Sequence, residues 1–226
     1  MSIYKLAMGD EFDRLHPKIQ ERFGFDSTSG VASVGTGVME TMERGGWWTV
    51  PFLWVGSLRH IMFPDTGKDV PFTVHNYAYV DRHGRETVTW VRHFEFPERR
   101  RWFDATMVYS AKRGTLIDYI GNQQHLSVDI ACSVDEATGG IRLRSGEQRF
   151  YEKWLAFKFP LFASGMADVV EWYDDEAEEF GISVEVRNRI FGTLFSYSGR
   201  FQAEFFDIEA AKIPPFVKPL REESRE

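Results

Sequence analysis

The feature that most constrains the fold is a pair of hairpin-like segments rich in Val, Thr and aromatic residues. Val70–Val80 and Glu86–Phe96 flank a turn at 81–84, and Trp102–Ser110 and Thr115–Ile120 flank a turn that ends at Gly114. Runs of β-branched and aromatic residues on both sides of a short glycine-containing turn predict antiparallel hairpins. The chain is therefore expected to contain a mostly antiparallel sheet.

Other segments extend this sheet. Leu126–Val134 alternates apolar and polar residues, which is typical of a strand with one buried face. Further strand candidates are Val34–Arg44, Ile141–Tyr151, Asp168–Tyr173, Ile182–Ile190 and Tyr197–Ile208. Closure of such a sheet removes its exposed edges, so we expect a β-rich (α+β) fold. It would be an antiparallel β-barrel or strongly curved sheet of about nine or ten strands with about two to four short helices.

Three segments are not predicted as strands. The first 25 residues carry apolar residues at helical spacing and are interrupted by Pro17, which predicts two short helices or a kink. Pro51–Phe63 is broadly apolar and predicts a short helix that acts as a lid or plug. Trp154–Met166 is expected to be a crossing or a short helix. Residues 1–213 are expected to form one barrel-like domain, followed by a charged, frayed tail at 214–226.

Composition narrows the class of protein. Aromatic residues make up 15% of the chain, which suits a wide core or an apolar pocket. The net charge of −7 argues against nucleic-acid binding. The single cysteine, Cys132, excludes an internal disulfide and fits a cytoplasmic location. No apolar run is long enough to span a membrane, so no membrane partner is expected. The oligomeric state stays open.

Sequence motifs for cofactors are absent. Gly35-Thr36-Gly37 resembles the start of a dinucleotide-binding loop, but Glu40 stands where the third glycine belongs. Phosphate-binding loops, nucleophile elbows and paired cysteine motifs are missing. His93 and Glu95 share one strand face, but a third ligand is not evident. Neither a cofactor nor a metal is expected.

Arg92 interrupts the aromatic face of its strand. It shares that face with Val88, Trp90, Phe94 and Phe96. A polar group on an apolar face costs several kcal/mol unless it is paired. If His83-Gly84 forms a two-residue turn, Arg92 lies opposite His75 and Trp90 lies opposite Tyr77. A one-residue change in loop length would place Asn76 instead of His75 opposite Arg92.

A buried arginine requires an anion or several acceptors. Glu147 is one candidate partner, although a bulge at Gly146 would change its phase, and Asp118 and Glu40 are alternatives. One hypothesis is a buried structural bridge. The other is that Arg92 holds a ligand oxygen while His75 or Glu147 moves a proton, which makes these three the candidate catalytic residues. Candidate ligand-binding residues are Trp90, Phe94, Tyr77, Trp54, Asn188 and Tyr197.

Three local patterns resemble a known family. They are Leu15-His16-Pro17, the run Trp90-Val91-Arg92-His93-Phe94 and the run Tyr197-Ser198-Gly199-Arg200-Phe201. In this order they resemble a bacterial family catalogued as domain of unknown function 4166, from about Tyr4 to Ile208. The resemblance marks Trp90, Arg92 and Phe94 as a signature without assigning them a role. Some members of the family are joined to dehydrogenase-like domains, which implies a metabolic setting.

Three functions follow from these patterns. The leading hypothesis is an aromatic-lined pocket that binds an apolar small molecule and promotes a cofactor-independent cyclisation or isomerisation, with Arg92 polarising one oxygen. The second is a non-catalytic binding or carrier protein. The third is a protein-interaction module whose rings form a flat exposed patch.

Overall fold

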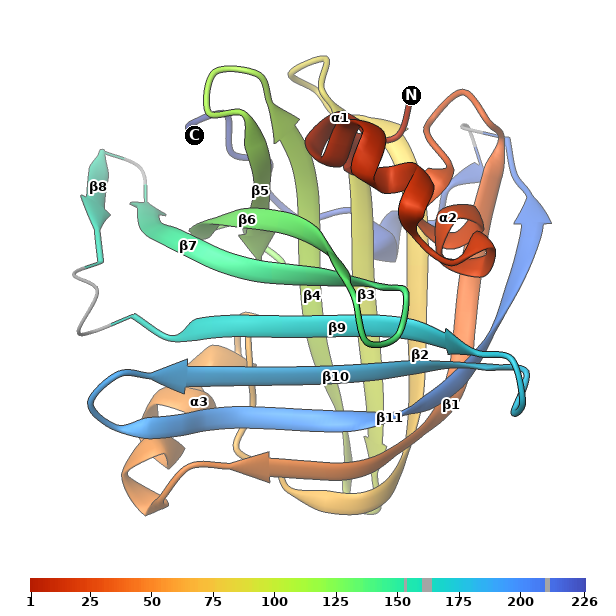
Figure 1. Cartoon of the computed structure of the whole chain (residues 1–226). Coiled ribbons are helices and arrows are strands. Elements are labelled where there is room, and N and C mark those ends of the chain that lie inside the picture. Colours follow the sequence, from red (N-terminus) through yellow and green to blue (C-terminus); the bar gives the residue numbers. More distant parts are fainter. Residues whose placement is uncertain (153, 160–163, 210–211) are drawn as a thin grey trace.

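The alternating segments form a closed antiparallel β-barrel in the computed structural model, which describes residues 1–152, 154–159, 164–209 and 212–226 (Figure 1). The neighbour order is β6-β5-β4-β3-β2-β1-β11-β10-β9-β7, and pairing of β6 with β7 closes the ring of ten strands. The strands are β1 (Val31–Arg44), β2 (Gly67–Val80), β3 (Glu86–Phe96), β4 (Arg99–Ser110), β5 (Thr115–Ile120), β6 (Leu126–Asp135), β7 (Gly140–Glu152), β9 (Met166–Asp174), β10 (Glu179–Asn188) and β11 (Gly192–Asp207). The predicted barrel is confirmed.

An eleventh strand lies at the edge of the barrel. β8 (Leu155–Lys158) pairs with β7, with Arg149 opposite Lys158. The expected crossing or short helix over Trp154–Met166 is therefore wrong at 155–158. Residues 160–163 of that segment lie outside the described residues.

Short helices cover one end of the barrel (Figure 1). They are α1 (Ile3–Met8), the 3-10 helix η1 (Gly9–Arg14) and α2 (Pro17–Gly24). Proline at the first position of α2 lacks only an N–H that would be unpaired anyway, and His16 Nδ1 caps the helix by accepting from the Lys18 amide. The prediction of two short helices separated at Pro17 is confirmed.

A further helix lies at the opposite end of the barrel (Figure 1). The 3-10 helix η2 (Trp47–Thr49) leads into α3 (Val50–Ser57). The predicted helix in Pro51–Phe63 is therefore present in the first part of that segment and ends at Ser57. Leu53 is buried, whereas most other large side chains of α3 face solvent. This helix therefore covers only part of that end.

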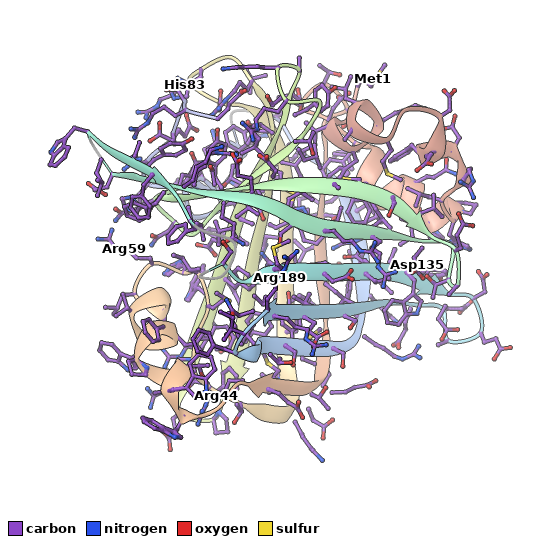
Figure 2. All side chains as sticks on the ribbon, turned by 60° about the vertical axis from the view of Figure 1, so that its left-hand side comes forward. Met1, Arg44, Arg59, His83, Asp135 and Arg189 are labelled. Atoms are coloured by element: carbon purple, nitrogen blue, oxygen red, sulfur yellow. The ribbon has the colours of Figure 1, made fainter. Side chains whose placement is uncertain are left out.

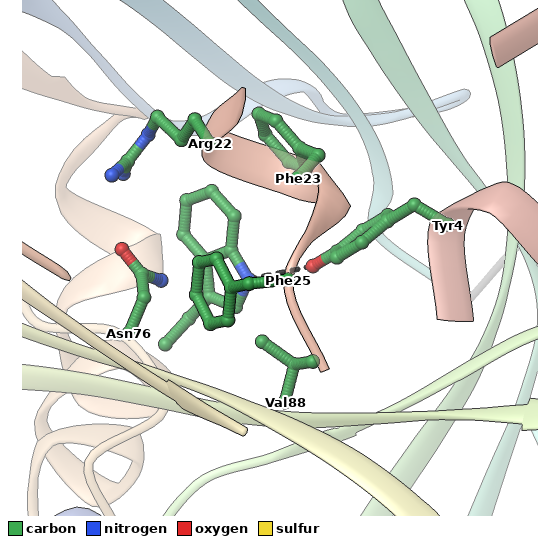
Figure 3. A pocket seen from close by; sticks show the side chains of 7 residues that line it. Tyr4, Arg22, Phe23, Phe25, Asn76 and Val88 are labelled. Carbon is green, nitrogen blue, oxygen red and sulfur yellow. Dashed lines mark hydrogen bonds between the residues drawn. The ribbon is translucent and has the colours of Figure 1, made fainter. Parts of the chain in front are cut away.

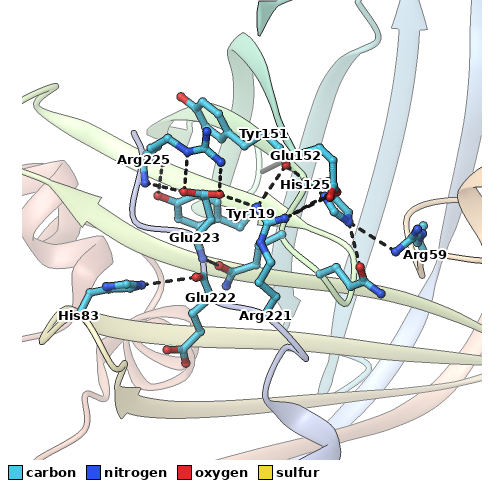
Figure 4. Close-up of polar contacts among 12 residues, drawn as sticks. Arg59, His83, Tyr119, His125, Tyr151, Glu152, Arg221, Glu222, Glu223 and Arg225 are labelled. Carbon is cyan, nitrogen blue, oxygen red and sulfur yellow. Dashed lines mark hydrogen bonds and ion pairs between the residues drawn. The ribbon is translucent and has the colours of Figure 1, made fainter. Parts of the chain in front are cut away.

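The charged C-terminal segment lies against the outside of the barrel. It includes the 3-10 helix η4 (Pro215–Val217), and Val217 is buried beside Tyr77, Tyr79 and Val91. The Glu223 carboxylate accepts hydrogen bonds from Arg225 and Arg221 (Figure 4). The expected fraying is therefore not seen in the described residues after Pro214, because apolar contacts and a hydrogen-bonded network hold them.

No helix within the described residues is long and apolar enough to cross a membrane.

Candidate ligand-binding cavity

The barrel encloses a cavity of about 600 Å³. Side chains from β3 to β7 and β9 to β11 line it, together with residues of η2 and α3. Most of the lining is aliphatic or aromatic; its apolar members include Phe103, Met107, Val128, Leu143, Val169, Ile182, Val184 and Val186. This volume and lining are typical of small-molecule sites, which measure about 300–1,000 Å³.

The cavity opens at the α3 end. Phe52, Val55 and Phe191 line it and are nevertheless 75%, 63% and 58% exposed, so they lie where the interior meets solvent. The ring of Phe191 lies 5.0 Å from that of Trp48, joining the β10–β11 turn to η2. Figure 2 brings this end forward, with α3 and the turn that carries Arg189 facing the viewer.

Arg92 faces this cavity from β3 and is 7% exposed. Its Nε donates to the Phe103 carbonyl at 3.1 Å, and its Nη1 donates to the Tyr197 hydroxyl at 3.1 Å. Its Cζ lies 3.9 Å from the centroid of the Phe103 ring. Both hydrogen-bond acceptors are neutral, and Arg92 forms no ion pair with any carboxylate in the described part of the chain. The expected bridge to Glu147 is not formed.

Asp118 is the second ionisable group that lines the cavity. Burial raises the pKa of its carboxyl to about 7, although the charge of Arg92 and the backbone of Thr106 lower it. Its Oδ1 is buried and has no partner among the described residues. Asp118 and Arg92 therefore carry unused hydrogen-bonding capacity inside an apolar space.

Four other polar side chains that line the cavity form hydrogen bonds with backbone groups. Thr49 Oγ1 donates to the Gly46 carbonyl, and Ser145 Oγ accepts from the Ala167 amide. Gln148 donates to the Gly165 carbonyl, and Asn188 donates to the Ser164 carbonyl. These contacts fix loops and strand ends, so Arg92 and Asp118 differ from the remaining polar lining.

The inner end of the cavity is closed by tight packing beneath α1 and α2. Trp90 lines the cavity and donates from Nε1 to the Tyr4 hydroxyl at 2.7 Å. Figure 3 shows Tyr4, Arg22 and Phe23 approaching from the helices. Arg22 and Glu171 form an ion pair in which both side chains are 1% exposed. Arg22 thus has a carboxylate partner, whereas Arg92 has none within the described ranges.

The predicted position of His75 is wrong because the β2–β3 turn is longer than two residues. Asp81 and Arg85 close a three-residue turn with Gly84 at φ +77°, and Asp81 Oδ1 accepts from the His83 and Arg85 amides. Val74 consequently lies opposite Arg92. A one-residue slip moves every side chain to the other face, so His75 packs outside against His93 and Phe216.

The predicted placement of Glu147 beside Arg92 is wrong for a related reason. The β6–β7 register shifts between Val128, which pairs with Gln148, and Ile130, which pairs with Ser145. The bulge anticipated at Gly146 is therefore present and places Glu147 outside, beside Arg113. Hydrogen bonds from Lys158 and Arg149 lower the pKa of Glu147 to about 2, so it stays ionised near neutral pH.

The six candidate ligand-binding residues divide into three groups. Trp90 and Asn188 line the cavity. Phe94 and Tyr197 point inward but are packed together, with ring centroids 5.3 Å apart, and the Tyr197 hydroxyl accepts a hydrogen bond from Arg92. Tyr77 lies in the outer apolar cluster under the C-terminal segment, and Trp54 is exposed on α3 without lining the cavity.

Asp118 interrupts the inward face of Leu116 and Ile120 just as Arg92 interrupts its own strand face. The same sequence signal therefore identifies Asp118 as a site residue in its own right, and not only as a partner for Arg92. The same signal was present at Glu171. Within the described residues no group of three potential metal-ligating side chains comes together.

These features define a closed ten-stranded antiparallel barrel with an apolar cavity. Two ionisable side chains line that cavity: Arg92, which forms no ion pair within the described residues, and Asp118, whose Oδ1 has no hydrogen-bond partner there. The chain belongs to the family described as domain of unknown function (DUF4166), whose model matches residues 15–201. It is similar to the uncharacterized protein YndH of Bacillus subtilis (strain 168), with 32% identity over 203 residues. That alignment covers 90% of this chain and 97% of YndH.

Proposed function

We propose that the barrel binds an apolar small molecule in its cavity and that Arg92 is the polar anchor. The observation that carries this proposal is the state of Arg92: it is buried, it lines the cavity and it has no anionic partner within the described residues. A buried arginine is costly unless its charge and donors are satisfied. A ligand oxygen would supply the missing acceptor.

The apolar lining supplies the affinity for the rest of the ligand. Removing apolar surface from water contributes roughly 25 cal/mol per Å². The lining strands β9 and β10 present Ala167, Val169, Ile182 and Val184 to the same space. The ligand body would therefore be apolar, with a single polar end near Arg92.

Binding can be tested with Nile red, an uncharged dye whose fluorescence rises in apolar surroundings. The protein should bind the dye saturably, and Val184→Trp should abolish binding by filling the cavity. Ser183→Trp is the matched control because its side chain is exposed on the outer face of the same strand. Equal dye binding by both variants, or no saturable binding by the natural protein, would overturn the proposal.

Asp118 supports a second candidate function, isomerisation of the bound ligand by proton transfer. A carboxyl group whose pKa lies near 7 can accept a proton from carbon and return it at another position. Arg92 would polarise the adjacent carbonyl and stabilise the enolate that forms. No external oxidant or reductant is required.

This second candidate predicts that a β,γ-unsaturated ketone is converted to its conjugated isomer. Asp118→Asn should remove the conversion while Nile red binding persists, because the amide keeps the shape but not the basicity. A natural protein that binds the ketone and returns it unchanged would instead be a carrier.

A further inference from the structure

We infer that the ligand is an amphiphile with an apolar body and one carboxylate, and that the guanidinium of Arg92 binds that carboxylate. This inference rests on the proposed function, because it specifies the chemistry of a ligand in the same cavity. The inference adds one property to the proposed ligand: its polar end carries a single negative charge, which the ionisable groups that line the cavity favour.

The free donors of Arg92 match a carboxylate. A guanidinium carries five N–H donors, and acceptors in the described residues take one from Nε and one from Nη1. The second N–H of Nη1 and both of Nη2 remain. Two parallel donors on a planar group fit the two oxygens of a carboxylate. Phe103 and Tyr197 hold the guanidinium in place without neutralising it.

The charges inside the barrel favour a monoanion. Arg22 is paired with Glu171, so it is not a second anion site. Asp118 is the carboxyl group that shares the cavity with Arg92, and burial raises its pKa to about 7. Once a ligand carboxylate approaches, Asp118 would take up a proton. Its Oδ1, which has no partner among the described residues, would then donate a hydrogen bond to the ligand. A cationic ligand would be repelled by the charge of Arg92.

Other ionisable groups act on this pair from the surrounding elements. The charge of Arg92 acts to lower the pKa of three buried carboxyl groups, Asp118, Asp104 and Glu171. It acts in the same direction on the pKa of the Tyr197 hydroxyl. Burial holds the pKa of Tyr4 and Tyr197 above the ordinary value, so both hydroxyls stay neutral at pH 7. Asp118 lines the cavity, whereas Asp104 and Glu171 do not, so Asp118 is the group expected to titrate with the bound ligand.

The experiment compares dodecanoic acid, dodecan-1-ol and dodecylamine as competitors of Nile red at pH 7. These ligands share one chain and differ in the charge of the polar end. We expect dodecanoic acid to bind most tightly and dodecylamine least. Arg92→Met should weaken dodecanoic acid by about 30-fold, to the level of the alcohol, which corresponds to about 2 kcal/mol for loss of a buried charge contact. Arg144→Met is the control, because it removes an exposed charge from the outer face of β7. It should change neither the affinity for dodecanoic acid nor that for dodecan-1-ol.

The outcomes separate this inference from the proposed function. If Nile red binds in the cavity but the alcohol competes as well as the acid, the carboxylate inference is wrong while the cavity still binds apolar ligands. If Nile red does not bind at all, the proposed function itself fails. Should Arg92→Met fail to fold, the ranking of the three ligands with the natural protein decides the question, and Arg92→Lys adds a folded variant that keeps the charge but loses the planar fork.

Discussion

Arg92 on β3 donates a hydrogen bond from Nη1 to the hydroxyl of Tyr197 on β11, 3.1 Å away, across the interior of the barrel. This contact orients the guanidinium but leaves its charge without a counterion in the described residues. Arg22 differs, because its charge meets Glu171. These two buried arginines therefore differ in their partners: Arg22 forms an ion pair, and Arg92 donates only to neutral oxygens among the described residues.

The two arginines should respond differently to the same substitution. Arg22→Met leaves the carboxylate of Glu171 buried without its partner and should destabilise the fold by about 3–5 kcal/mol. Arg92→Met removes a buried charge that has no ion-pair partner among the residues the structure describes, so the variant should be at least as stable as the natural protein. Chemical denaturation at pH 7 measures both. Equal destabilisation would assign Arg92 a structural role.

Asp118 should make stability depend on pH. Its folded pKa of about 7 lies above the ordinary value of 3.8, so the folded state binds the extra proton. The stabilisation is complete below about pH 4 and is lost as pH rises through 7, with a total effect of up to about 4 kcal/mol. The free energy of unfolding of Asp118→Asn minus that of the natural protein should therefore increase as the pH rises from 4 to 8, because only the natural protein loses stability over this range. A difference that stays constant over this range would contradict the assignment.

Glu223 should contribute stability of the opposite pH dependence. Burial raises the pKa of this carboxyl, but hydrogen bonds from Arg225 and Arg221 outweigh it and bring the pKa to about 2. Glu223→Gln should cost about 1–2 kcal/mol at pH 7. The cost should disappear as pH falls from 4.5 toward 2, because the natural carboxylate is then protonated. Glu209→Gln is the control: its exposed pair with Lys212 should contribute little.

The helical cover should be coupled to the barrel through Tyr4 and Trp90. Tyr4→Phe leaves the buried Nε1–H of Trp90 without its acceptor and should cost about 1–3 kcal/mol. Trp90→Phe removes the other partner. In a double-mutant cycle the two changes should be less than additive, because the second removes a contact already lost. Strictly additive free energies would show that the hydrogen bond does not link α1 to β3.

Local sequence patterns were sufficient for most strands. The alternation in Leu126–Val134 and the paired Val/Thr-rich runs depend on neighbouring residues, so they predicted β6 and the β2–β3 hairpin. The register of that hairpin was missed because Asp81 closes a three-residue turn with its carboxylate. One residue in turn length decides which face His75 occupies.

The candidate site was predictable only where polarity interrupts an apolar face. Arg92 was found in this way, and Asp118 carried the same signal in a shorter strand. The partners of Arg92 could not be found in this way, because Phe103 acts through its carbonyl and Tyr197 lies 105 positions away. The exclusion of Glu147 required the position of the bulge at Gly146 to be known.

The sequence by itself determined a barrel-like antiparallel fold and a buried arginine on its aromatic face, because both depend on the alternation of residues along single strands. Only the tertiary structure decided that Arg92 has no anionic partner in the described part of the chain, that Asp118 shares its cavity and that Arg22 is paired with Glu171. Closure of the barrel brings side chains from strands that are distant in the sequence into one interior. Which ionisable groups remain without a counterion there depends on all of these side chains together.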